Sequence, residues 1–150
     1  MRRLLMTLLL FCLVRSTGQT NYFITSADGT KLYIQEWGNG KPVILLAGGP
    51  GLNAIYMDSV WLHLSLMFRC IVIDQRGTGK TTIASLDSQA LSMNNYINDL
   101  EALRKRLHLE KLTLIGHSWG GMLAMDYAGK YPNHVNKLVP LNWEVLGFSN

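Results

Sequence analysis

The sequence has 150 residues, of which 48% are hydrophobic and 16% charged, and its formal net charge is +4. This balance is typical of a folded globular protein and excludes a disordered chain. The length suits one domain with a hydrophobic core of its own.

The first 20 residues, MRRLLMTLLLFCLVRSTGQT, have the layout of a secretory signal peptide. Arginines precede an apolar stretch from Leu4 to Val14, and small polar residues follow it. The apolar stretch is well short of the ~20 residues that span a bilayer. We therefore predict a signal peptide over residues 1–19, export to the periplasm or the extracellular space, and no stable membrane anchor after cleavage. Arg15 leaves the cleavage site open, and an N-terminal core helix is the competing interpretation.

The basic excess of the sequence belongs to this N-terminal segment. Its removal deletes Arg2, Arg3 and Arg15 and lowers the net charge from +4 to +1. No nucleic-acid partner is therefore predicted. Of the two cysteines, Cys12 lies in the predicted signal and Cys70 in the apolar run CIVID, so we expect no disulfide within the mature chain.

Apolar runs and amphipathic stretches alternate along the rest of the chain. The stretch NYFITSADGTKLYIQEWG predicts two strands around a turn at residues 27–30. Short apolar runs that end in glycines or loops predict strands buried on both faces of a sheet. The other predicted elements are a strand in 42–49, a helix from about 54 to 67, a strand in 69–77, an irregular stretch at 80–92, a helix at 93–107, a strand in 111–116, a helix at 119–130 and a strand in 135–142.

This alternation predicts the α/β class, with a doubly wound and mostly parallel sheet after an N-terminal hairpin. On the helix at 93–107 we expect Glu101 and Lys105 to form an i,i+4 pair on the outer face. The basic cluster at 104–106 is interpreted as a solvated helix face.

The stretch Gly116-His117-Ser118-Trp119-Gly120 matches the G-x-S-x-G nucleophile elbow, with a predicted strand before it and a predicted helix after it. A serine on so sharp a turn adopts a strained backbone, and glycines two positions away let strand and helix pass closely. We predict that Ser118 is a catalytic nucleophile. The N–H of Trp119, at the helix N-terminus, would face the oxyanion.

A glycine-rich loop at residues 47–51, AGGPG, follows the first buried strand. Gly48 and Gly49 have no side chain, so a backbone N–H here can approach a carbonyl oxygen closely. This loop is the candidate for the second half of an oxyanion hole. An ordinary Gly-Pro turn is the competing interpretation.

The motifs GGPG, DQRGTGKT and GHSWGG, in this order, resemble the proline iminopeptidase (prolyl aminopeptidase) group of the α/β-hydrolases. The resemblance runs from about residue 22 to residue 142. It implies that Ser118 is the nucleophile and that Trp119, with Gly48 and Gly49, donates the oxyanion hydrogen bonds. One departure is Ala47, because the family usually has a histidine there that supports the loop.

The same resemblance assigns residues 74–79 to a structural loop beside the active site, which includes Asp74, with Arg76 holding neighbouring backbone. The segment GTGKT at 77–81 also suggests a nucleotide-binding loop. A P-loop requires a glycine five positions before Gly79, and Asp74 occupies that position. We therefore exclude a nucleotide-dependent enzyme, and we predict no metal and no organic cofactor.

A hydrolase of this fold takes its partners in the order serine, acid, histidine. No residue of this chain is predicted to be the acid or the base of the triad. The acids and histidines considered and set aside are Asp126, Glu144, His134, His117, His63 and His108. The resemblance places acid, base, helical cap and last strands beyond Asn150. We therefore expect residues 20–150 to be the N-terminal part of a hydrolase domain, and we expect this chain to have little or no activity of its own. The stretch VNKLVPLN is then predicted to be an edge strand with an uncovered apolar face.

The leading functional hypothesis is a serine hydrolase that releases N-terminal residues, proline favoured, from peptides through an acyl-serine intermediate. One alternative is an esterase or amidase of the same fold that acts on a small ester or amide. Another is a truncated remnant without catalysis. The sequence does not indicate an oligomeric state.

Overall fold

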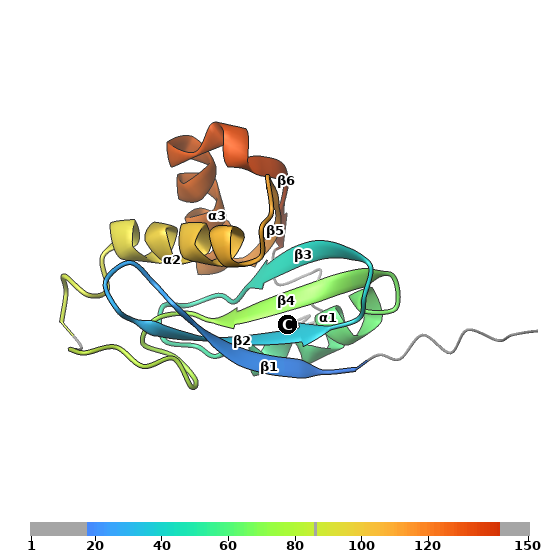
Figure 1. Ribbon diagram of the computed structural model, residues 1–150, viewed down its shortest axis with the longest axis horizontal. Helices are drawn as coiled ribbons and strands as arrows, with labels where there is room; N and C mark the ends of the chain where they lie inside the picture. The colour runs from blue at the N-terminus through green and yellow to red at the C-terminus, as the bar shows by residue number, and fades with distance from the viewer. Residues whose placement is uncertain (1–17, 86, 142–150) are drawn as a thin grey trace, which may run out of the picture.

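The computed structural model describes residues 18–85 and 87–141. Its six strands form one sheet in the order β1-β2-β4-β3-β5-β6 (Figure 1). In chain order the elements are β1 (Thr20–Thr25), β2 (Lys31–Trp37), β3 (Lys41–Leu46), η1 (Ala54–Met57), α1 (Asp58–Leu64), β4 (Phe68–Asp74), α2 (Met93–Arg106), β5 (Leu112–His117), α3 (Trp119–Lys130), η2 (Pro132–His134) and β6 (Val135–Leu141).

The N-terminal hairpin joins the sheet in antiparallel fashion, and the remaining strands are parallel. β1 pairs with β2 and β2 with β4 in antiparallel register, whereas β4, β3, β5 and β6 pair in parallel. The hairpin turn is closed by a 2.9 Å hydrogen bond from Ser26 N–H to Thr30 O, with Gly29 at a φ of 88°. The predicted α/β architecture, with its hairpin and mostly parallel sheet, is confirmed.

Helices cover both faces of the sheet because its central strands are apolar on both sides. Successive residues of a strand point to opposite faces. Leu46 of β3 accordingly packs into the core under α2 and α3, whereas Leu45 packs into the core under η1 and α1. Figure 1 shows α2 and α3 together on one side of the sheet and α1 on the other. The predicted helix at 54–67 is a short 3-10 turn followed by α1.

Glu101 of α2 lies between α2 and α3 and not on the outer helix face. Its carboxylate accepts hydrogen bonds from Arg104 (2.7 and 2.9 Å) and from the Tyr127 hydroxyl (2.9 Å), and it lies 3.2 Å from His134 Nδ1. The predicted partner Lys105 is more distant, at 3.8 Å. The i,i+4 pair therefore exists, but the outer-face placement of Glu101 was wrong. Arg104 likewise belongs to this buried cluster and not to a solvated face.

The Glu101 cluster predicts a pH-dependent part of the protein's stability. Its hydrogen bonds, above all those from Arg104, lower the pKa of Glu101 from 4.5 to about 2. The folded state thus favours the charged carboxylate, so this contribution is present above pH 4.5 and is lost as the pH falls toward 2. We expect Glu101→Gln to flatten the decline of the unfolding free energy over that window. Denaturant titrations at several pH values measure the unfolding free energy of both proteins.

The exposed Glu110 provides the matched control, because Glu110→Gln removes a carboxylate that lies outside the cluster. We expect this variant to keep the acid dependence of the wild type. An equally steep decline in Glu101→Gln and in the wild type would show that the cluster does not stabilise the fold.

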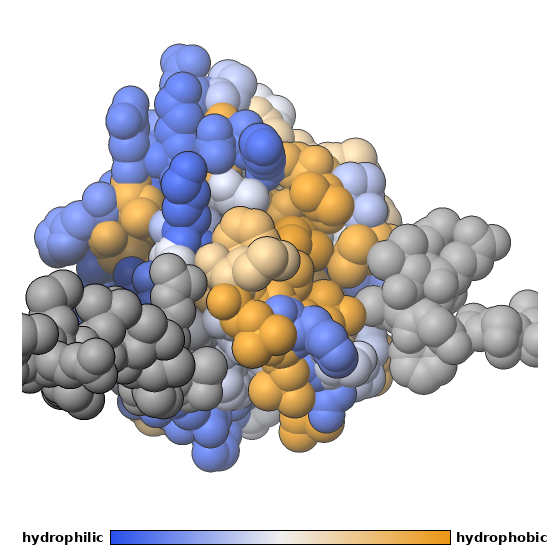
Figure 2. Space-filling model, turned by 90° about the vertical axis from the view of Figure 1, so that its right-hand side faces the viewer, coloured by the Kyte–Doolittle hydropathy of each residue, from blue (hydrophilic) through white to orange (hydrophobic). Residues whose placement is uncertain are grey.

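β6 is the outer strand of the described sheet, as predicted. Pro140 lies within it, opposite Gly116 of β5, and proline is tolerated at such an edge. A cavity of about 540 Å³ next to β6 is lined by Ser59, Val60, His63, Leu64, Ile115, Val139 and Leu141. Apolar side chains also gather on the face of the molecule seen in Figure 2.

The predicted signal segment lies almost entirely outside the described residues, which begin at residue 18. Within the described ranges, no helix combines the length and the apolar character that a membrane crossing requires. Glu144, one of the acids considered above, also lies outside the described residues.

Candidate active site

Ser118 lies at the junction between β5 and α3. Its φ of 48° and ψ of −112° are unusual for a residue with a side chain, and such strain persists only where the surroundings enforce it. The Ser118 carbonyl accepts hydrogen bonds from the N–H groups of Gly121 (2.9 Å) and Met122 (3.1 Å), and the Ser118 N–H donates to Leu141 O (3.3 Å). The residue is exposed. A tightly anchored turn therefore presents Ser118 at the surface.

The two elbow glycines are needed because strand and helix backbones approach closely here. An added Cβ at Gly116 would lie 2.3 Å from Gly120 O, and one at Gly120 would lie 2.3 Å from Leu46 O. Both obstacles are backbone atoms, which cannot rotate away as a flexible side chain can. The structure thus brings the elbow against the end of β3, where the glycine-rich loop begins.

The glycine-rich loop is held by Tyr56 of η1. The Gly48 N–H donates to the Tyr56 hydroxyl, which also lies 2.8 Å from Nδ1 of His117. Burial lowers the pKa of His117, which favours a neutral ring. Gly49 has a φ of 63°, in the left-handed region that glycine adopts readily. Because the Gly48 N–H already has an acceptor, Gly49 is the better candidate of the two predicted oxyanion donors.

Gln75 joins this loop to the elbow, and the sequence did not single it out. Its Nε2 donates to Ala47 O (2.9 Å), and its Oε1 accepts from the indole Nε1–H of Trp119 (3.0 Å). Gln75 is only 5% exposed. The one available signal was its position inside the DQRG motif, between two residues that were assigned to a structural loop.

Arg76 ties three segments together next to Gln75. Its guanidinium makes two hydrogen bonds to Asp99 of α2 (2.7 and 2.8 Å) and one to Asp28 of the β1–β2 turn (2.9 Å). It also donates to Ala90 O (2.6 Å). The side chains of Arg76 and Asp99 are 0% and 3% exposed. A buried charge network therefore fixes the loop that carries Gln75.

Asp74 forms hydrogen bonds with the last two residues of the segment GTGKT at 77–81. Its Oδ2 accepts from the Lys80 N–H (2.9 Å), and its backbone carbonyl accepts from the Thr81 hydroxyl. An added Cβ at Gly79 would lie 2.0 Å from Asp74 Oδ2. Burial raises the pKa of Asp74. The segment is a turn with no helix beginning at Lys80, so it lacks the helix N-terminus that a P-loop uses to bind phosphate.

The acids and histidines considered for a triad have other surroundings. His134 Nδ1 lies 3.2 Å from Glu101, and His63 Nδ1 lies 2.6 Å from Ser59 O. His117 contacts Tyr56, and Asp126 is exposed on α3. Within the described ranges we assign neither the acid nor the base.

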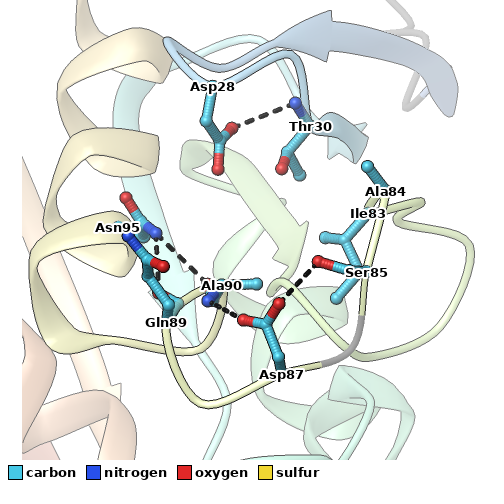
Figure 3. A pocket seen from close by; sticks show the side chains of 9 residues that line it. All are labelled: Asp28, Thr30, Ile83, Ala84, Ser85, Asp87, Gln89, Ala90 and Asn95. Carbon is cyan, nitrogen blue, oxygen red and sulfur yellow. Dashed lines mark hydrogen bonds between the residues drawn. The ribbon is translucent and has the colours of Figure 1, made fainter.

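A cavity of about 260 Å³ with a mixed polar and apolar lining lies between the β1–β2 turn and the segment before α2 (Figure 3). On its walls, Asp87 accepts from the Ser85 hydroxyl (2.8 Å) and the Ala90 N–H (2.7 Å), and Asp28 accepts from the Thr30 N–H (3.0 Å). None of the predicted site residues lines this cavity. We therefore do not assign it as the substrate site.

Comparisons with known proteins agree with this geometry. Residues 41–143 match the family described as alpha/beta hydrolase fold. The chain is 37% identical over 118 residues to a cis-3-alkyl-4-alkyloxetan-2-one decarboxylase of Shewanella oneidensis, covering 78% of this chain and 37% of that protein. It is 37% identical over 100 residues to a proline iminopeptidase of Lactobacillus helveticus, covering 65% of this chain and 34% of that protein.

Among solved structures, epoxide hydrolase A of Mycobacterium thermoresistibile matches with a TM-score of 0.71 and 26% identity. The match covers 79% of this chain and 37% of that one. The chain thus spans little more than a third of the length of these relatives. The predicted resemblance is confirmed: the chain belongs to the α/β-hydrolase fold family, and proteins named proline iminopeptidase are among its distant relatives.

Proposed function

We propose that this protein is a serine hydrolase in which Ser118 is the nucleophile of an acyl transfer. The observation that carries the proposal is the backbone of Ser118, held at a φ of 48° between β5 and α3. A strained, exposed serine at a strand–helix junction is the geometry that a nucleophile elbow requires. A serine at this position favours acyl transfer over a mechanism that begins with a carboxylate nucleophile.

In the proposed reaction, Ser118 Oγ attacks the carbonyl carbon of an amide and loses its proton to a base that we place outside the described residues. The backbone N–H groups of Trp119 and Gly49 stabilise the oxyanion. The C–N bond then breaks and the amine leaves with the proton. Water hydrolyses the acyl-serine and releases the acid.

As substrate we propose a peptide with a free N-terminus, with proline as the favoured first residue. The motifs GGPG and DQRG support this choice, together with the relatives that are named proline iminopeptidases. The second candidate is an esterase or amidase, because the same elbow serves many acyl substrates. We also propose export of the protein, which rests on the signal-like layout of residues 1–19.

The two enzymatic candidates can be separated with the complete product of the gene. We expect kcat/KM to be higher for a proline arylamide than for a simple ester of an aliphatic acid. Both are measured from the released chromophore. An ester that is cleaved while the arylamide is untouched would favour the esterase, and inertness toward both would favour a non-catalytic remnant.

A further inference from the structure

We propose that Gln75 is a positioning residue that holds the two halves of the oxyanion hole in a fixed position relative to each other. The inference rests on the proposed function, because it concerns the donors that would stabilise the oxyanion. One half is the loop at residues 47–51, and the other is the first turn of α3. Gln75 lies between them and forms a hydrogen bond with each, to Ala47 O at 2.9 Å and from Trp119 Nε1 at 3.0 Å.

On the loop side, Gln75 and Tyr56 hold the two ends of one peptide unit. The carbonyl of Ala47 accepts from Gln75, and the N–H of Gly48, in the same peptide plane, donates to Tyr56. This plane cannot rotate without losing both hydrogen bonds. A loop with consecutive glycines would otherwise be free to flip. The clamp therefore sets the direction in which the next backbone N–H, that of Gly49, is presented.

The clamp also explains how the loop is supported although Ala47 has no side chain that can form hydrogen bonds. At this position the resemblance led us to expect a histidine that supports the loop. The methyl group of Ala47 is buried, and its carbonyl is held by Gln75 instead. Support thus comes from two neighbouring elements, the end of β4 and η1.

On the elbow side, Gln75 holds the indole of Trp119, whose backbone N–H is the other proposed donor. The indole also packs edge-on against Tyr96, with 5.5 Å between ring centroids. Gln75 is itself held in place, because it is 5% exposed and precedes the buried Arg76. The bridge needs a donor toward Ala47 O and an acceptor toward Trp119 Nε1. A primary amide provides both, whereas a carboxylate or a thioether does not.

The test is made on the complete product of the gene with Gln75→Met, which keeps the length of the side chain and removes both hydrogen bonds. We expect kcat to fall about 10- to 100-fold with little change in KM, because misplaced oxyanion donors act on the transition state. Trp119→Phe removes only the indole arm, so its loss is expected to be smaller. Both substitutions break the hydrogen bond between Gln75 and the indole of Trp119. The double variant is therefore expected to have the kcat of Gln75→Met, apart from a small packing loss.

The matched control is Tyr127→Phe, which removes a buried 2.9 Å hydrogen bond from the same helix α3 but touches neither arm of the bridge. Its kcat is expected to equal that of the wild type even if its melting temperature falls. Hydrogen exchange at the Gly48 amide provides a readout that needs no activity. We expect faster exchange in Gln75→Met and unchanged exchange in Tyr127→Phe.

An unchanged kcat together with unchanged exchange at Gly48 in Gln75→Met would overturn the inference. So would an equal loss of kcat in Tyr127→Phe, because the effect would then be one of general stability. If wild-type Ser118 does not react with a fluorophosphonate, the proposed function itself fails. Exchange at Gly48 then decides alone: faster exchange in Gln75→Met supports the clamp, and unchanged exchange overturns it.

Discussion

Replacing Ser118 by alanine is expected to lower kcat of the complete gene product by about 10⁶-fold, as the loss of the nucleophile does in subtilisin. The elbow turn keeps its shape, because the backbone hydrogen bonds of residue 118 do not involve the hydroxyl. The proposed oxyanion donors remain, so a residual acceleration of ~10³–10⁴ over water is expected. Steady-state hydrolysis of a proline arylamide measures both kcat and KM.

Ser59 of α1 provides the control for this experiment, because it is exposed and lies outside the elbow. Ser59→Ala is expected to hydrolyse the arylamide at the wild-type rate. If Ser118→Ala lost less than about tenfold in kcat, the nucleophile would have to be sought elsewhere in the protein. A change in KM alone would likewise assign Ser118 to substrate binding.

The second large effect is expected in Arg76→Met, which should lower the unfolding free energy by about 3–5 kcal/mol. The substitution leaves the carboxylate of Asp99, 3% exposed, without its counter-charge. It also frees the turn at Asp28 and the backbone of Ala90. Chemical denaturation at neutral pH measures the loss. Lys105→Gln, which removes an exposed lysine 3.8 Å from Glu101, is the control and should cost only about 0.3–0.5 kcal/mol.

The loss of unfolding free energy in Arg76→Met is expected to shrink as the pH is lowered. Burial already raises the pKa of Asp99 above its ordinary value, and Arg76 opposes that rise. Without Arg76 the pKa of Asp99 rises further. Because the pKa of Asp99 is raised in the folded state, the cost of burying its charged carboxylate is present at neutral pH and disappears as Asp99 becomes protonated. A deficit that grows on acidification, or one below about 1 kcal/mol at neutral pH, would contradict a buried charge network at this position.

Much of the fold could be predicted from the sequence, because its signals are local. The apolar runs gave the parallel strands, and the spacing in GHSWG gave the strand–turn–helix around Ser118. Glu101 was misplaced because an acidic residue on an amphipathic helix ordinarily faces solvent. Its partners Tyr127 and His134 lie 26 and 33 positions away in the chain, so only the folded structure brings them together.

The least predictable part of the site is the support around it. Gln75 forms hydrogen bonds with residues 28 and 44 positions away, and neither bond has a local sequence signature. The bond between Gly48 N–H and Tyr56 likewise could not be inferred from the glycine-rich motif. The candidate nucleophile can be picked out from a short motif, whereas the residues around it are brought together only by contacts between distant segments.

The most direct test of Ser118 as the nucleophile is peptide mass spectrometry of the complete gene product after treatment with a fluorophosphonate. We predict a single covalent adduct on Ser118 in the wild type and none in Ser118→Ala. An adduct on another residue, or hydrolysis of the proline arylamide by a protein whose Ser118 stays unmodified, would contradict the proposed mechanism.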